Sequence, residues 1–131
     1  MKKVVEDLQS VCDTPLQIDT SDPEALEKSL RIYNGKAMIN SVNGKRSSMD
    51  SVFPLVKKYG GVVVALTLDE NGIPATADER VKIAEKIIAE AKKYGIDKKD
   101  IVVDALAMSV SSDKNSAQVT IDSVRKLTHD L

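Results

Sequence analysis

The sequence contains no tryptophan, one cysteine, one histidine and only 3% aromatic residues. A single cysteine, Cys12, cannot form a disulfide within the chain. Cys12 and the single histidine, His129, lie at opposite ends of the chain and cannot make up a zinc site, so we expect no protein-ligated metal. We expect Cys12 to be a half-buried thiol and His129 to be a solvated side chain at a helix end. The shortage of aromatic rings leaves no platform on which nucleic-acid bases could stack.

Long apolar runs and an excess of one charge are also absent. No stretch approaches the roughly 18 consecutive apolar residues of a membrane helix, and the opening MKKVVEDLQSV lacks the apolar centre of a signal peptide. We therefore expect a cytoplasmic protein. The net charge of −1 argues against nucleic acid or an anionic membrane as a partner. With 131 residues, of which 42% are hydrophobic, the chain is one domain or part of one.

Two hydrophobic periods alternate along the chain and predict an α/β fold. The predicted order is a leading helix over 1–12, followed by four strand–helix units within 15–129. The strands are expected at 16–19, 36–40, 62–66 and 101–104. Strands that alternate with helices of this length pair in parallel through right-handed crossovers.

Local signals predict where the helices begin, where they end and which faces they bury. Helix starts are predicted at Ser21-Asp22-Pro23, at Ser47 or Ser48 with Pro54 in the first turn, and at a capping box from Thr76 to Glu79. Helix ends are predicted at Asn34-Gly35, Gly60-Gly61 and Gly95. The apolar stripes of the first and last helices are expected at Val4, Leu8 and Val11, and at Ala117, Ile121, Val124 and Leu127.

Two architectures share this element order: an open doubly wound sheet and part of an eight-stranded βα barrel. Periodicity alone does not distinguish them. A doubly wound nucleotide-binding protein normally has a glycine-rich turn after its first strand. The corresponding turn, Asp19-Thr20-Ser21-Asp22-Pro23, has no glycine, which argues against nucleotide binding.

Three predicted strands end in a carboxylate or an amide, at Asp19, Asn40 and Asp104. The carboxyl ends of parallel strands lie on one side of the sheet, where ligands bind. Each residue alone has a simpler explanation, because Asp19 could cap the next helix and Asn40 could bond within its own turn. Together they form two acceptors and one amide, which suit a flat heterocycle with several N–H donors.

Several segments resemble one family of enzymes. The segment PLQIDTSDPEAL at 15–26 resembles the Ile/Leu-Asp-Ser-x-x-Pro/Val-x-Ala-Leu segment of methyltetrahydrofolate methyltransferases. AMINSV at 37–42 is similar to their Ile-Asn-Ser strand, and VALTLDENGIP at 64–74 to their Leu-Thr-Met-Asp-Glu-x-Gly-Ile-Pro loop. The similarity runs in register from about residue 4 to residue 127. It points to the pterin-binding domain of the methionine synthase-like methyltransferases that use corrinoid or homocysteine.

This resemblance implies a partial TIM barrel in which Asp19, Asn40 and Asp104 hold the pterin ring of methyltetrahydrofolate. It implies a methyltransferase that passes the methyl group to cobalt(I) of a corrinoid such as cobalamin. The corrinoid would belong to a partner protein or domain. No catalytic residue is identified within the chain.

The sequence departs from the family pattern in ways that carry further expectations. The family's Asp-Pro-Leu-x-x-Pro-Val reads DALAMSV at 104–110, and the loss of both prolines should loosen this loop. By comparison the chain covers roughly strands three to six of eight, with a Ser-Asn motif expected beyond Leu131. We therefore expect a weak or inactive fragment that forms a homo-oligomer, such as a homodimer, or pairs with the missing half. The alternatives are a fragment of a dihydropteroate synthase-like pterin enzyme and a non-catalytic half-barrel scaffold.

Overall fold

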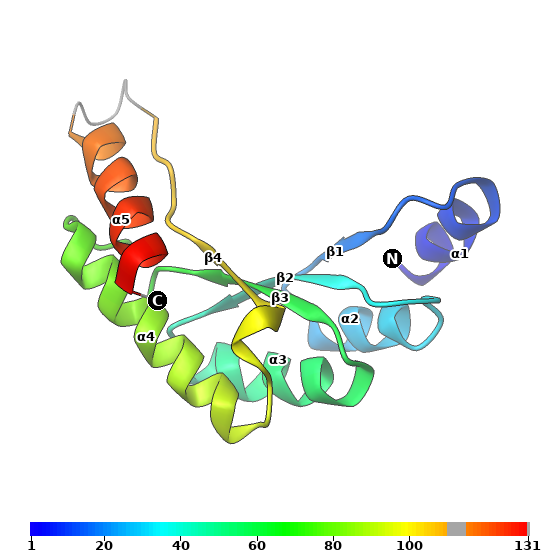
Figure 1. Ribbon diagram of the computed structural model, residues 1–131. Coiled ribbons are helices and arrows are strands. Elements are labelled where there is room, and N and C mark those ends of the chain that lie inside the picture. Colours follow the sequence, from blue (N-terminus) through cyan, green and yellow to red (C-terminus); the bar gives the residue numbers. More distant parts are fainter. Residues whose placement is uncertain (110–114, 131) are drawn as a thin grey trace.

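The computed structural model describes residues 1–109 and 115–130, and its element order is the predicted one (Figure 1). A leading helix is followed by four strands that alternate with helices, with a short 3₁₀ turn before the last strand. The elements are α1 (Lys2–Val11), β1 (Gln17–Asp19), α2 (Pro23–Leu30), β2 (Met38–Asn43), α3 (Arg46–Tyr59), β3 (Val62–Leu66), α4 (Ala77–Lys93), η1 (Lys98–Asp100), β4 (Ile101–Asp104) and α5 (Ser116–Asp130).

The four strands form one parallel sheet in the order β1-β2-β3-β4. The strand order never reverses, as it does at the centre of a doubly wound sheet. Helices α2, α3 and α4 cover one face of the sheet, and within the described residues no helix lies flat on the opposite face (Figure 1). The fold is therefore α/β and consistent with part of a TIM barrel.

The hydrophobic core lies between the sheet and α2, α3 and α4. It is built from alternate strand residues, among them Ile18, Ile39 and Val63, which are at most 2% exposed. The ring of Phe53 is completely buried and lies 5.5 Å from the ring of Tyr94, centroid to centroid. Because one face is packed and the other is open, polar residues on alternate strand positions point to the open face.

Most of the helix starts follow the sequence signals. The Asp22 side chain accepts hydrogen bonds from the backbone amides of Glu24 and Ala25, with Pro23 at the first helical position of α2. The predicted N-cap of α4 is confirmed, because the Thr76 hydroxyl accepts from the Glu79 amide at 3.4 Å; the Glu79 carboxylate accepts from the Thr76 hydroxyl at 2.8 Å and not from the Thr76 amide that completes a capping box.

The end of α2 was predicted too late. The helix ends at Leu30, and the segment up to Asn34-Gly35 is not helical. The intervening residues bond to other elements instead. The Tyr33 hydroxyl accepts from the Leu16 amide at 3.1 Å, and the Asn34 amide donates to the Gln9 side chain at 2.7 Å.

The start of α3 also differs from the prediction. Neither Ser47 nor Ser48 is its N-cap; the cap position is Lys45, without a side-chain bond, and Pro54 is the ninth helical residue instead of a first-turn residue. The physical reason is a long-range cap. The Arg46 amide donates to the Glu70 carboxylate at 3.1 Å, so the helix needs no capping side chain of its own.

The apolar stripe of α1 was predicted on the wrong face, and the stripe of α5 is only partly buried. In α1 only Val5 is buried, whereas Val4, Leu8 and Val11 are exposed. In α5 Ala117 and Leu127 are half-buried, but Ile121 and Val124 are about half exposed, at 52% and 50%. Helix α5 packs against α4, and its Val124 and Leu127 line a groove together with Ile101 of β4.

The two unique side chains have different outcomes. Cys12 is exposed rather than half-buried; it follows the last residue of α1, and its thiol donates to the Leu8 carbonyl. His129 is exposed in the last turn of α5, as predicted. Within the described residues no helix combines the length and the apolar character needed to span a membrane. Two features predicted from the sequence, Val110 of the segment at 104–110 and Leu131, lie outside the described residues.

Candidate functional site

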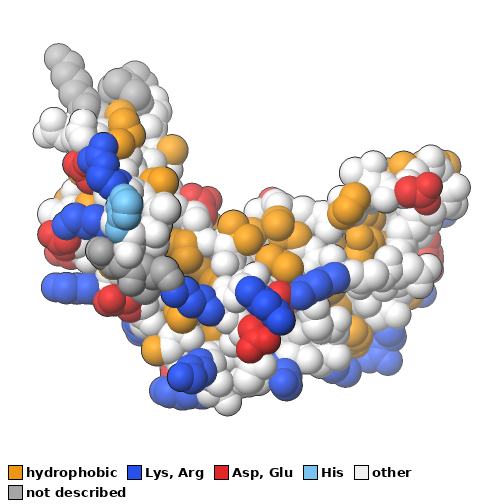
Figure 2. Space-filling view, in the orientation of Figure 1, with side chains coloured by type: hydrophobic (Ala, Val, Ile, Leu, Met, Phe, Trp, Pro, Cys, Tyr) orange, Lys and Arg blue, Asp and Glu red, His pale blue; other side chains and the backbone are white. Residues whose placement is uncertain are grey.

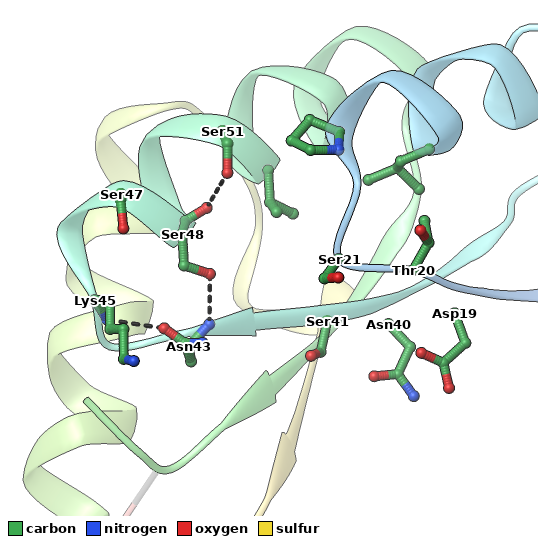
Figure 3. A pocket seen from close by; sticks show the side chains of 13 residues that line it. Asp19, Thr20, Ser21, Asn40, Ser41, Asn43, Lys45, Ser47, Ser48 and Ser51 are labelled. Carbon is green, nitrogen blue, oxygen red and sulfur yellow. Dashed lines mark hydrogen bonds between the residues drawn. The ribbon is translucent and has the colours of Figure 1, made fainter. Parts of the chain in front are cut away.

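Asp19 and Asn40 are direct partners on neighbouring strands. They occupy the same register position on β1 and β2, and their side chains lie together on the side of the sheet away from α3 (Figure 3). Among the described residues neither side chain has a hydrogen-bond or ion-pair partner. The capping role that could have explained Asp19 belongs to Asp22. Both polar side chains are therefore free to bind a ligand.

The sequence placed Asn40 at the end of its strand, and the structure corrects this. Strand β2 continues to Asn43, and its register with β3 shifts between Asn40 and Val42, where the Asn40–Ser41 peptide bond is cis. Val42 is completely buried on the helical side. With the extra residue between them, Asn40 lies on the open face and Val42 enters the core.

A cavity of about 440 Å³ begins beside these two residues. Its volume is in the range of roughly 300–1,000 Å³ typical of small-molecule sites. It is lined mainly by hydroxyl and amide side chains from the loop after β1, the end of β2 and the first turns of α3: Asp19, Thr20, Ser21, Pro23, Leu26, Asn40, Ser41, Asn43, Lys45, Ser47, Ser48, Ser51 and Val52. Lys45 is the only cation in this lining. Some of the polar lining groups already bond one another: the Ser48 hydroxyl accepts from the Asn43 amide, and the Asn43 side chain accepts from the Lys45 amide (Figure 3).

Asp104 lies on the same face but further along the sheet. Asn40 pairs with Val64, and Asp104 pairs with Leu66, so Asp104 is two strands and two residues away from Asn40. Adjacent strands are about 4.8 Å apart, which puts the backbones of β2 and β4 on the order of 10 Å apart. Asp104 does not line the cavity. The structure therefore brings Asp19 and Asn40 together and leaves Asp104 at the opposite side of the open face.

One carboxylate oxygen of Asp104 is already used. Its Oδ1 accepts a hydrogen bond from the Leu106 amide at 2.8 Å. Within the part of the chain that the structure describes, Oδ2 has no partner. Asp104 thus presents one free acceptor to the open face, and Asp19 presents both of its oxygens. A planar heterocycle lying over this face can donate hydrogen bonds to the carboxylates at two of its edges and form a hydrogen bond with the Asn40 amide at one of them.

Two charged residues have roles that the sequence analysis missed. Glu70 accepts from the Arg46 amide, and hydrogen bonds from its own backbone amide and that of Arg46 hold the pKa of its carboxyl below the ordinary value. Arg80 is only 3% exposed, and its guanidinium donates to the carbonyls of Ala105 and Leu106. Neither role has a local sequence signal, because Glu70 and Arg80 lie more than 20 residues away in the chain from these partners. Over residues 1–109 and 115–130 no group of three or more His, Cys, Asp or Glu side chains is placed to hold a metal ion.

Comparison with known proteins places the chain among pterin enzymes. The family model described as "Pterin binding enzyme" matches residues 1–131. The chain is 31% identical to a methionine synthase of Mycobacterium leprae, over 97% of the chain and 11% of that protein. It is 29% identical to a methylcorrinoid:tetrahydrofolate methyltransferase of Eubacterium limosum, over 100% of the chain and 50% of that protein. The chain thus spans half the length of the second relative and about a tenth of the first.

Proposed function

The chain belongs to the pterin-binding enzyme family, and from this premise we propose that it is the methyltetrahydrofolate-binding part of a corrinoid-dependent methyltransferase. The observation that carries the proposal is the pair Asp19 and Asn40, which share a register position and have no partner among the described residues. A half-buried polar side chain such as Asn40 normally has a hydrogen-bond partner, so its lack of one beside a cavity suits a ligand, and the exposed carboxylate of Asp19 lies next to it.

The ring of a pterin matches the acceptors on the open face. Its pyrimidine half carries a ring N–H and an amino group, which donate to a carboxylate, and we assign these to the free Oδ2 of Asp104. Asn40 and Asp19 then bond to the opposite edge of the bicyclic ring. The spacing of β2 and β4, on the order of 10 Å, supports this division between two ends of one ligand.

The reaction proposed is methyl transfer from a ring nitrogen to the cobalt(I) of a corrinoid held by a partner protein or domain. The carbon–nitrogen bond breaks with its electron pair left on nitrogen, and the corrinoid supplies the electron pair for the new bond. An amine anion is a poor leaving group, so the nitrogen must be protonated or strongly hydrogen-bonded as the bond breaks. The described residues contribute orientation of the pterin and no covalent intermediate.

A partner that covers the open face also belongs to the proposal. Strands β1 and β4 are unpaired edges among the described residues, and Val102 of β4 is 45% exposed. Figure 2 shows hydrophobic side chains in the hollow between α5 and α1. Exposed strand edges and apolar patches of this kind favour association. We propose that a second copy of the chain, or the remainder of a barrel, covers these edges and apolar side chains. The cellular location that we propose for the protein is the cytoplasm.

Titration calorimetry with methyltetrahydrofolate tests the binding proposal. We expect binding by the protein, a loss of about tenfold or more for Asp104→Asn, since hydrogen bonds to charged groups are worth about 1.5–3 kcal/mol, and no change for Asp13→Asn at an exposed position. Absence of binding by the unsubstituted protein would identify a non-catalytic scaffold. Equal loss in both variants would remove Asp104 from the site.

Sedimentation at micromolar concentration tests the association proposal. We expect a dimer that Val102→Lys weakens, because the substitution puts a charge on the exposed part of β4. Ile73→Lys is the control, since Ile73 is similarly exposed, at 41%, but lies in the loop before α4. A monomer in all three samples would contradict the proposal.

A further inference from the structure

Arg80 is a buried arginine with no carboxylate partner within the described residues. It lies in the first turn of α4 and is 3% exposed, and burial lowers the pKa of its guanidinium. A buried charge is costly unless it is compensated by hydrogen bonds. Here the compensation comes mainly from backbone carbonyls: Nε donates to Pro74 at 3.1 Å, and Nη1 donates to Ala105 at 2.6 Å and to Leu106 at 2.8 Å. The Thr120 hydroxyl accepts a longer bond from Nη1 at 3.4 Å.

The two carbonyls bound by Nη1 directly follow Asp104 in the chain. Leu106 has a φ of 59°, in the left-handed region, which costs a residue with a side chain on the order of 1–2 kcal/mol. In this conformation its amide reaches back to Oδ1 of Asp104 at 2.8 Å. Arg80 therefore stabilises the backbone conformation that makes the Leu106–Asp104 bond possible.

Asp104 is also held from the side of β3. The Thr67 amide and hydroxyl both donate to the backbone carbonyl of Asp104, at 3.1 Å and 3.0 Å, and Thr67 is completely buried. The backbone of Asp104 is thus fixed at its carbonyl and at the two residues that follow. The bond from the Leu106 amide to Oδ1 then holds the side chain in its present orientation.

We propose that Arg80 is a positioning residue for Asp104: by binding the carbonyls of Ala105 and Leu106 it keeps the Leu106 amide on Oδ1 and directs Oδ2 to the open face, where a pterin binds. The part that concerns the pterin rests on the proposed function. The part that concerns the carboxylate does not, since it depends only on contacts within the chain.

Amide hydrogen exchange of the protein without ligand tests the carboxylate part. In Arg80→Lys the charge remains, but one ammonium group cannot reproduce the fork of a guanidinium. We expect the Leu106 amide to exchange at least about tenfold faster, a loss typical of a weakened hydrogen bond, while the Gly44 amide, bonded to Leu68 elsewhere, keeps its rate. An unchanged Leu106 rate in a folded variant would overturn the proposal.

Calorimetry with methyltetrahydrofolate tests the pterin part through a double-mutant cycle. We expect Arg80→Lys to weaken binding about tenfold in the original protein and to have no further effect in Asp104→Asn, because the two residues act as one unit. Arg125→Lys, at an exposed ion pair on α5, is the control. Independent, multiplying losses would mean that Arg80 acts by a general effect on the fold. If the original protein binds no pterin, the proposed function fails while the exchange result stands.

Arg80→Gln provides a second variant, since it removes the buried charge but keeps an amide donor. We expect the same changes in the Leu106 exchange rate and in binding. If neither Arg80→Lys nor Arg80→Gln folds, as judged by circular dichroism, Arg80 supports the core instead of the site and the proposal is wrong.

Discussion

The amide of Gly44 donates a hydrogen bond to the carbonyl of Leu68 at 2.8 Å, so that the loop after β2 is joined to the loop after β3. There is no room for a side chain at this contact. A Cβ atom at position 44 would lie 2.9 Å from Cγ2 of Ile83 and 3.0 Å from the Leu68 carbonyl oxygen. The close approach fixes the two loops relative to each other beside the candidate site.

Gly44→Ala is therefore expected to destabilise the fold. Overpacking of this kind costs about 1–3 kcal/mol, and the neighbouring carbonyl belongs to the backbone and cannot rotate away. Urea unfolding measures the change as a lower midpoint. Ser47→Ala, at an exposed position in the first turn of α3, serves as the control and should change stability by less than about 0.5 kcal/mol. Equal stability of the glycine and alanine proteins would show that the loops can separate.

Asn40→Ala should weaken pterin binding without unfolding the protein. Asn40 is half-buried and its side chain has no partner among the described residues, so its removal leaves no internal group unsatisfied. A lost neutral hydrogen bond of about 0.5–1.5 kcal/mol corresponds to roughly a two- to tenfold weaker affinity. Calorimetry measures the affinity, and Asn71→Ala in the exposed loop before α4 is the matched control. Unchanged affinity for methyltetrahydrofolate in Asn40→Ala would remove the amide from the site.

The sequence was sufficient where the determining contacts are short in range. Asp22, Thr76 and Glu79 cap helices through residues two or three positions away, and the four strands follow from local apolar runs. It was insufficient where the partner is distant. Glu70 caps α3 across 24 residues, and Arg80 bonds Ala105 across 25, so no local pattern could have indicated either.

The same distinction applies to the candidate site. Asp19 and Asp104 are the last residues of their strands, as predicted, because parallel strands necessarily bring their carboxyl ends to one side, whereas Asn40 lies three residues before the end of β2. The sequence could not show that Asp104 shares an oxygen with the Leu106 amide, since that depends on a left-handed residue that is not glycine. Whether the three residues bind a pterin remains a prediction.

Pro54→Ala is expected to stabilise the protein. Pro54 lies inside α3 and is exposed, so alanine would add no steric conflict and would restore an amide that can donate to the Asp50 carbonyl one turn earlier. Proline in a helix interior costs up to about 3 kcal/mol relative to alanine. Thermal unfolding should show a higher midpoint for the variant. A lower midpoint would mean that the helix geometry around Pro54 is required by the packing of Phe53 against the core.

Acid should destabilise the fold through surface carboxylates. Hydrogen bonding by Lys58, then by Tyr59, lowers the pKa of Glu27, and a hydrogen bond from Arg46 lowers the pKa of Asp50. A carboxyl whose pKa is lower in the folded state than in the unfolded state stabilises the fold above its ordinary pKa, and this stabilisation disappears as the pH falls through the folded value. The loss is therefore expected below about pH 4.5, the ordinary value for glutamate.

Thermal unfolding as a function of pH measures this effect. Glu27→Gln should flatten the profile below pH 4.5, because the glutamine does not titrate. Added salt should reduce the difference between the two proteins, since Glu27 is partly exposed and its partner Lys58 is exposed, so that their charges are screened. Identical profiles for Glu27→Gln and the original protein would assign the acid sensitivity to other carboxyls.

Strand β2 contains one residue more than its neighbour between Asn40 and Val42, and this divides it into two halves whose alternation is out of phase. Deletion of Ser41 would remove the extra residue and leave a regular alternation, in which Asn40 still faces the open side and Val42 still faces the core. The extra residue therefore does not decide which face these two side chains take; it adds the Ser41 side chain to the wall of the cavity and bends the strand beside Asn40. A variant without Ser41 is expected to keep its core and to change the shape of the cavity at this point.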